Sequence, residues 1–268
     1  MDLTPTPLCT VLVERYVTPL REGGSMPAIV EADDLGMYVL KFRGAGQGIR
    51  ALIGELVSGG IARALGLPIP EIVLTRLHAK LAQTEPDPEI QDLIRASDGL
   101  NVGLDYLPGS VNFDPAVDAV SDAFASQLVW FDTLVSNVDR TARNTNLLMW
   151  QRQPWLIDHG ATLTFHHAWE GTVADPGKPF APIADHVLLG RASQLQQVDA
   201  RFAPQLTPQV LHDILASVPD CFLHQAAQDR HSDALADPQA HRAAYVNYFV
   251  ARLQDRGRWL QGAIDARA

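Results

Sequence analysis

The sequence has few cysteines, an excess of acidic over basic residues, and no long apolar run. Its two cysteines, Cys9 and Cys221, provide neither a disulfide framework nor a cysteine zinc site, and such scarcity is typical of a reducing cytoplasm. The 31 acidic and 21 basic residues give a formal net charge of −10, which argues against a broad nucleic-acid-binding surface. No run approaches the roughly 20 apolar residues needed to span a bilayer, so we expect no membrane segment.

The first residues, MDLTPTPLCTVLVERY, also lack the basic start and the apolar stretch of a secretory signal. We therefore expect a cytoplasmic protein. With 268 residues, of which 47% are hydrophobic and 19% charged, the chain can bury a sizeable core as one large domain or as two lobes that share a cleft.

The first third of the chain reads as strands plus one helix. β-rich segments predict strands at 9–17, 26–32 and 37–42, and the Gly23-Gly24 pair marks a turn between the first two. From Ile49 to Leu65 the apolar residues recur at helical spacing, which predicts one helix.

A further strand is expected at 69–77, followed by a polar insertion at 81–99 with one short helix. The apolar stretch from Leu100 then runs into a Pro-Gly turn, which we interpret as the crossing between two lobes. Beyond it the pattern is mostly helical, with helices predicted at 124–135 and near 207–217 and 239–255.

The segment SNVDRTARNTNLLMWQRQPWLIDHG, residues 136–160, holds the strongest chemical signal. Asp139 lies in a polar loop after a helix, and Asn144 follows five positions later. Two apolar runs around residues 151–153 predict a hairpin that carries Asp158 back toward Asn144. Carboxylate and amide oxygens in this arrangement suit a hard cation, with Asp139 placed to accept a hydroxyl proton.

VDRTARN followed by LIDHG resembles the catalytic loop and the metal-binding loop of the protein-kinase-like superfamily. Together with EGGSMPAIVEADDLGMYVLKF, ALIGELVSGGIARALGLPIPE and VWFDTLVSNVDRTARNTNLL, which follow in the family's order, the chain resembles a short, stand-alone HipA-like kinase over roughly residues 10 to 165. The resemblance implies an α+β, bilobed protein-kinase-like fold. We expect a β-rich N-lobe with one helix at 1–105, a mainly helical C-lobe at 106–268, and the nucleotide between them.

The resemblance also implies the role of each site residue. Asp139 would be the catalytic aspartate, with Asn144 and Asp158 holding Mg²⁺ on the phosphates of ATP. Lys41 would reach the α- and β-phosphates, and Glu55 would pair with Lys41. The turn Gly23-Gly24-Ser25 would cover the phosphates with backbone N–H groups. Adenine would meet backbone groups near Leu104, Asp105 and Tyr106.

The sequence departs from typical protein kinases beside the predicted base. Val138 stands directly before Asp139, where typical protein kinases have an arginine that binds the phosphorylated activation loop. Arg140 or Arg143 is expected to meet phosphate instead. Glu55 lies roughly 140° from the centre of its helix's apolar stripe, at about 100° per residue, which directs it toward solvent.

These residues predict a Mg-ATP-dependent phosphotransferase that acts on a hydroxyl, expected to be a serine or threonine of a protein. The same ligand set also serves small-molecule kinases and phosphoinositide kinases, and a nucleotide-binding pseudokinase that works through partner contacts is a further alternative. The larger HipA proteins act as toxins beside a DNA-binding antitoxin; since the resemblance starts near the first residue, we assume neither that role nor that partner. No motif after about residue 170 identifies the acceptor.

Overall fold

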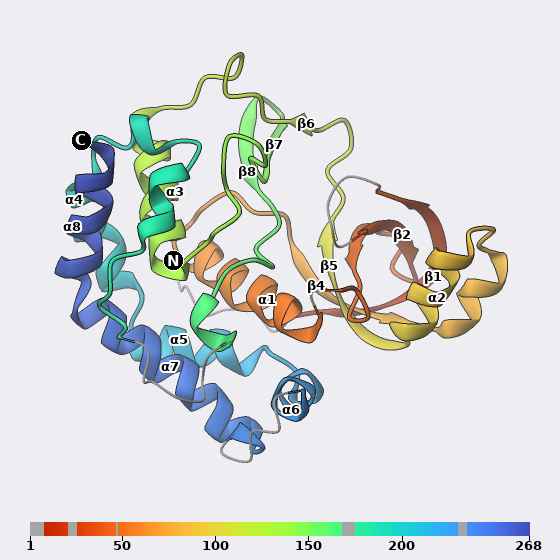
Figure 1. Cartoon of the computed structure of the whole chain (residues 1–268). Coiled ribbons are helices and arrows are strands. Elements are labelled where there is room, and N and C mark those ends of the chain that lie inside the picture. Colours follow the sequence, from red (N-terminus) through yellow and green to blue (C-terminus); the bar gives the residue numbers. More distant parts are fainter. Residues whose placement is uncertain (1–7, 21–25, 47, 168–174, 230–234) are drawn as a thin grey trace.

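The computed structural model describes residues 8–20, 26–46, 48–167, 175–229 and 235–268 (Figure 1). Its strands are β1 (Thr10–Pro19), β2 (Ala28–Ala32), β3 (Met37–Lys41), β4 (Ile72–Leu77), β5 (Gly99–Asp105), β6 (Val111–Asn112), β7 (Leu147–Trp150) and β8 (Gln153–Leu156). Its α-helices are α1 (Gly48–Ala64), α2 (Pro88–Ala96), α3 (Asp122–Val135), α4 (Leu195–Phe202), α5 (Pro208–Ala216), α6 (Asp220–Gln228), α7 (Pro238–Gln254) and α8 (Arg256–Arg267). Short 3-10 helices are η1 (Ala79–Thr84), η2 (Thr164–His167), η3 (Ala181–Asp185), η4 (Leu189–Arg191) and η5 (Ala203–Gln205).

The strands of the first third form a closed barrel in the order β1-β2-β3-β5-β4. Neighbouring strands pair antiparallel except at the closure, where residues 10–12 of β1 run parallel to residues 74–76 of β4. The barrel has its own apolar interior, which includes Val13, Val30 and Leu40, and η1 and α2 contribute to it through Ala82, Ile90 and Ile94. The sequence predicted a small sheet; the parallel β1–β4 pairing is what closes it.

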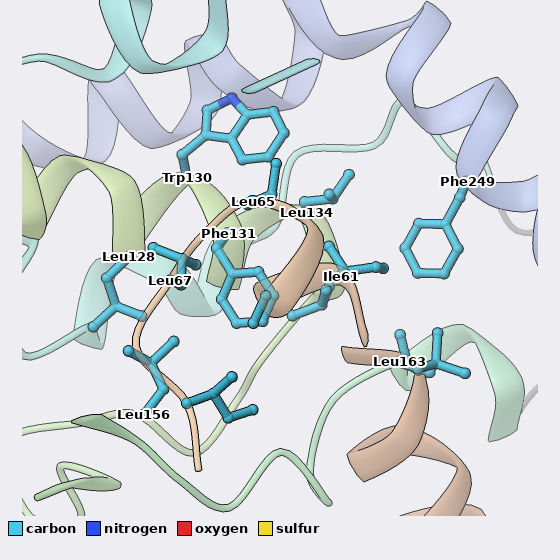
Figure 2. Close-up of a cluster of buried hydrophobic side chains, with 14 of the residues drawn as sticks. Ile61, Leu65, Leu67, Leu128, Trp130, Phe131, Leu134, Leu156, Leu163 and Phe249 are labelled. Atoms are coloured by element: carbon cyan, nitrogen blue, oxygen red, sulfur yellow. The ribbon is translucent and has the colours of Figure 1, made fainter. Parts of the chain in front are cut away.

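Helix α1 packs against the helical part of the chain as well as against the barrel. Its apolar residues belong to the same buried cluster as those of α3, and Figure 2 shows Ile61 and Leu65 beside Phe131 and Leu134. At its start, the Arg50 guanidinium donates to the carbonyl of Ala226 in α6. One helix thus joins the barrel to the C-terminal helices (Figure 1).

The second part of the chain is mainly helical, with α3 at its centre. Ser121 caps the start of α3 by accepting the N–H of Phe124, and the helix ends at Ser136, which takes a left-handed conformation with φ 56°. Beside α3, β6, β7 and β8 form a small antiparallel sheet, and the hairpin predicted around residues 151–153 is confirmed.

The predicted α+β class is confirmed, whereas the division into lobes at about residue 105 stays a prediction. Within the ranges described above, no helix is both long and apolar enough to cross a membrane.

Candidate functional site

Lys41, the last residue of β3, lies between two carboxylates. Its Nζ is 2.7 Å from Oδ1 of Asp158 and 4.0 Å from Oε2 of Glu55, and its side chain is buried. Burial by itself lowers the pKa of Lys41, but the charges of Glu55 and Asp158 outweigh it and hold this pKa above its ordinary value. The ammonium group is therefore charged at neutral pH.

Glu55 points into the protein, so the prediction from helical periodicity that it faces solvent is wrong. Its side chain is 1% exposed, because α1 is covered on this face by the turn that follows β8. The backbone N–H of His159 donates to Glu55 Oε2 at 2.9 Å, and His159 Nδ1 lies 3.4 Å from Oε1. Burial raises the pKa of Glu55, but Lys41 and His159 oppose burial and bring this pKa below its ordinary value.

The turn Asp158-His159-Gly160 brings a carboxylate to Lys41 and an imidazole into the core. Asp158 adopts φ 55°, a left-handed conformation that aspartate tolerates better than most residues. His159 is fully buried with its ring edge-on to Phe131. Two contacts with α1 hold the turn, since the His159 N–H donates to Glu55 and the Thr162 hydroxyl lies 2.7 Å from that of Ser58.

Asp139 lies in the loop after α3, with one carboxylate oxygen bound by two amides. Asn144 Nδ2 donates to Asp139 Oδ2 at 2.8 Å and Asn146 Nδ2 donates to the same oxygen at 3.1 Å. Among the described residues, no group donates to Asp139 Oδ1. One carboxylate oxygen is thus held by the protein while the other can accept a proton from an incoming hydroxyl.

Asn144 and Asp158 lie at the same end of the β7–β8 hairpin, as the sequence predicts, but Asn144 bonds to Asp139. The Ile157 N–H donates to the carbonyl of Asn146 at 3.1 Å and brings the two chain segments together. With its Nδ2 on Asp139, Asn144 keeps its Oδ1 available for a cation.

The expectation that Arg140 meets phosphate is wrong. Its guanidinium is fully buried, with Nε 2.6 Å from Oδ2 of Asp132 and Nη1 donating to the carbonyl of Asn146. Arg143 is exposed, so the expectation for Arg143 stays a prediction. Val138, which directly precedes Asp139, is 43% exposed.

The segment predicted to meet adenine has most of its backbone engaged. Leu104 pairs with Val39 of β3 and with Ile72 of β4. The Asp105 N–H donates to the carbonyl of Glu71 at 2.8 Å, and the Tyr106 N–H donates to that of Met37 at 2.9 Å. Of the described backbone around this segment, the carbonyl of Asp105 and the N–H of Leu107 have no hydrogen-bond partner.

A pocket of about 300 Å³, open solvent included, joins Lys41, Glu55 and Asp158 to the start of α1 at Gly48, Ala51 and Leu52. The predicted phosphate-covering residues Gly23, Gly24 and Ser25 lie outside the described residues.

Sequence reasoning missed Asp132 and Asn146. A carboxylate within the apolar helix sequence WFDTLV was a usable signal, because a buried charge needs specific partners. Asn146 follows Asn144 by only two positions, and its contact with Asp139 depends on the left-handed conformation at Asn146, φ 45°.

Comparisons with known proteins bear on the family and the fold of the chain. The profile of a family described as HipA-like kinase matches residues 13–243. Among solved structures, the Helicobacter pylori proinflammatory kinase CtkA superposes with a TM-score of 0.57 at 12% identity, over 97% of this chain and 98% of that chain, which shows a shared fold.

The Golgi casein kinase with Mn/ADP bound gives a TM-score of 0.42 at 12% identity, over 95% of this chain and 74% of that chain. A second structure of the Golgi casein kinase gives 0.42 at 11% identity, over 96% and 75%. No curated protein matches the sequence.

Proposed function

Because the chain belongs to the HipA-like kinase family and is therefore an ATP-dependent kinase, we propose that it transfers the γ-phosphoryl group of Mg·ATP to a hydroxyl group, with Asp139 as the catalytic base. The carboxylate of Asp139 carries this proposal, because its Oδ2 accepts from two amides and its Oδ1 is open. An acceptor hydroxyl that donates to Oδ1 would be oriented toward the phosphate, and the base would take its proton during transfer.

The cationic side of the site suits the phosphates. Lys41 would contact the α- and β-phosphates, and Glu55, which accepts the N–H of His159 in the turn after β8, would keep its ammonium group in place. Gly23, Gly24 and Ser25 would cover the phosphates with backbone N–H groups. The nucleotide would thus lie between the barrel and the helical part, in the bilobed arrangement of a kinase.

The oxygen donors at the end of the β7–β8 hairpin fit a divalent metal. Asp158 already has a cation beside it, since the Lys41 ammonium is 2.7 Å from its Oδ1, and Asn144 offers an amide oxygen. Magnesium is commonly held by one or two protein oxygens together with phosphates and water, so Asn144 and Asp158 would be its protein ligands. When bound, the metal would supply positive charge to the β- and γ-phosphates.

Adenine would be recognised by the chain after β5. Since the N–H groups of Asp105 and Tyr106 are used within the protein, the contacts near Leu104–Tyr106 would involve the Asp105 carbonyl and extend to the Leu107 N–H. An acceptor and a donor two residues apart match the amino group and a ring nitrogen of adenine.

The proposed acceptor is a serine or threonine hydroxyl of a protein. Val138 presents an apolar surface next to Asp139, where the flank of an acceptor side chain can pack. The acceptor's oxygen would then lie close to the open Oδ1 of Asp139.

Thermal unfolding with ATP, with and without Mg²⁺, tests the separate roles of Asp139 and Asp158. Wild type and Asp139→Asn should be stabilised by ATP plus Mg²⁺, because an asparagine oxygen can still accept from Asn144 and Asn146. Asp158→Asn should lose the magnesium-dependent stabilisation, while Asp92→Asn, an exposed change on α2, should behave as wild type.

Phosphate release from ATP, with water as the acceptor, completes the test. Turnover should fall at least about 100-fold in Asp139→Asn, the range expected for loss of a general base. ATP that stabilises no variant under any condition, or an Asp139→Asn enzyme as active as wild type, would overturn the proposal.

A further inference from the structure

The buried carboxylate of Asp132, in the last turn of α3, is a point where three chain segments meet. It is fully buried, and Asn137 Nδ2 donates to its Oδ1 at 2.9 Å. Its Oδ2 accepts from Arg140 Nε at 2.6 Å and lies 2.9 Å from His186 Nε2. Burial raises the pKa of Asp132, but Arg140, His186 and Asn137 together lower this pKa to about 2, so the group is ionised.

Two hydrogen-bonded branches lead from Asp132 to Asp139. In the first, Asn137 donates to Asp132 and accepts the backbone N–H of Asp139 at 3.0 Å. In the second, Arg140 bonds to Asp132 and to the carbonyl of Asn146, and Asn146 Nδ2 donates to Oδ2 of Asp139. The first branch fixes the backbone of the base, and the second, together with Asn144 Nδ2 on the same oxygen, fixes the rotation of its carboxylate.

His186 ties a third segment to the same carboxylate. The Leu188 N–H donates to His186 Nδ1 at 3.0 Å, which leaves the proton of a neutral ring on Nε2, where it donates to Asp132. Residues 186–187 lie along the catalytic loop, since Thr141 and His186 form a β-bridge and the Val187 N–H donates to the carbonyl of Arg140 at 3.2 Å. The chain that flanks Asp139 is thus held in register with it.

We propose that Asp132 is a positioning residue for phosphoryl transfer, which orients Asp139 through Asn137 on one side and through Arg140 and Asn146 on the other. The inference rests on the proposed function. A fully buried charge cluster often adds little net stability compared with well-packed apolar residues. Its value here lies in leaving a single oxygen, Oδ1 of Asp139, facing the acceptor. Misplacement of a reacting group by about 1 Å can cost about 100-fold in rate.

Asn146→Gly tests the second branch without straining the backbone. Residue 146 has φ 45°, a conformation that glycine adopts freely, so the change removes the amide and keeps the turn. Gln151→Gly is the matched control: residue 151 has φ 49°, is exposed at the tip of the β7–β8 hairpin, and is remote from Asp139 in this network.

With ATP, Mg²⁺ and water as acceptor, kcat for phosphate release should fall about 10-fold to 100-fold in Asn146→Gly. The dissociation constant of ATP should stay within about twofold, since Asn146 contacts the base and not the proposed nucleotide ligands. Gln151→Gly should match wild type in both. A purely structural role for Asn146 would instead lower thermal stability and leave kcat of the folded enzyme unchanged, which would overturn the inference.

Asp132→Asn tests the origin of both branches, with Asp199→Asn as control. Asp199 accepts from Trp130 Nε1 at 3.0 Å and from Arg256 at 3.1 Å, so it also bonds to α3 and to an arginine, but away from the site. Both variants should lose stability. Only Asp132→Asn should speed amide hydrogen exchange across residues 138–141, a readout that needs no activity.

The outcomes separate the inference from the proposed function. Wild-type protein that binds Mg·ATP and releases no phosphate would count against phosphoryl transfer itself. The inference alone would be overturned if wild type is active and the variants match their controls. That means an equal kcat in Asn146→Gly and Gln151→Gly, and equal amide hydrogen exchange across residues 138–141 in Asp132→Asn and Asp199→Asn.

Discussion

The two sides of the candidate site differ in how their charged groups are held. On the nucleotide side, Lys41 shares its charge between two carboxylates, 2.7 Å from Asp158 and 4.0 Å from Glu55. On the acceptor side, Asp132 receives close hydrogen bonds on both of its oxygens, and the network ends at one open oxygen on Asp139. In the proposed function, the first cluster would exchange partners when the nucleotide and metal bind, whereas the second would need no rearrangement.

This difference suits what each side is proposed to bind. The proposed ligands of the first cluster, phosphates and a metal, carry charge of their own, so Lys41 and Asp158 would have to release each other when these ligands bind. An acceptor hydroxyl is neutral, so the rate depends on where the base already points. The following predictions test this contrast, from the largest expected effect to the smallest.

Lys41→Met should have the largest effect on both stability and activity. It leaves the buried Glu55 carboxylate without its cation, and loss of one partner of a buried ion pair costs about 3–5 kcal/mol. Urea unfolding measures this cost, and binding of ATP should be lost as well. Lys80→Met removes an exposed lysine of η1 and serves as the control. Equal stability of the two variants would mean that Lys41 and Glu55 are not coupled.

Gly54→Ala should separate the turn Asp158-Gly160 from α1. A Cβ at Gly54 would lie 3.1 Å from the backbone oxygen of His159 and 3.2 Å from Oγ1 of Thr162, so the turn has to move. We expect a loss of about 1–3 kcal/mol from this overpacking, with weaker magnesium-dependent ATP binding. Gly257→Ala in α8, where a Cβ meets nothing within 4 Å, should be neutral or slightly stabilising. Thermal unfolding of the pair decides whether the close approach matters.

Much of the fold follows from local sequence pattern. Strands predicted at 37–42 and 69–77 and the helix predicted at 49–65 correspond to β3, β4 and α1. Helices α4, α6 and α8 were not predicted. The first two are short, with 8 and 9 residues. The sequence of α8, RGRWLQGAIDAR, has too few apolar residues to show a clear apolar stripe. Closure of the barrel was also missed, because it depends on β1 meeting β4 about 60 residues away.

The proximity of Asp139, Asn144 and Asp158 was predictable because a motif fixes their spacing, while their roles stay predictions. The prediction that Glu55 faces solvent was wrong because helical periodicity takes account of apolar side chains only. A glycine such as Gly54 also lets a neighbouring turn come close and cover that face of the helix. His186 bonds to Asp132 across 54 residues, and no local pattern reports such a contact. Residue types can be read from a local motif, but the partners that orient them come from tertiary packing.

Glu55→Gln tests whether the Lys41 ammonium group is shared between Glu55 and Asp158. With Glu55 neutral, the Lys41 ammonium would rest on Asp158 alone and compete more strongly with magnesium there. We expect the magnesium concentration needed for ATP binding to rise severalfold, equivalent to about 1 kcal/mol. Calorimetric titration of ATP at several magnesium concentrations measures this, with the exposed Glu89→Gln on α2 as control. An unchanged magnesium requirement would contradict the sharing.

The smallest predicted effect is the loss of stability in mild acid. We expect the group that titrates to lie outside both the Lys41–Glu55–Asp158 cluster and the Asp132 cluster. Glu55 and Asp132 have lowered pKa values and stay ionised above pH 5, whereas burial, Arg50 and Arg242 lower the pKa of His241 in α7 to about 4. The unfolded chain, with an ordinary histidine pKa near 6.5, takes up this proton first, so stability is full above about pH 6.5 and declines as the pH falls toward 4. His241→Phe keeps a ring against Tyr245 and should remove about 0.7 kcal/mol of the stability difference between pH 7 and pH 6. Urea unfolding at both pH values, with the exposed His212→Phe as control, checks this. A His241→Phe protein as acid-sensitive as wild type would show that His241 is not the group that titrates.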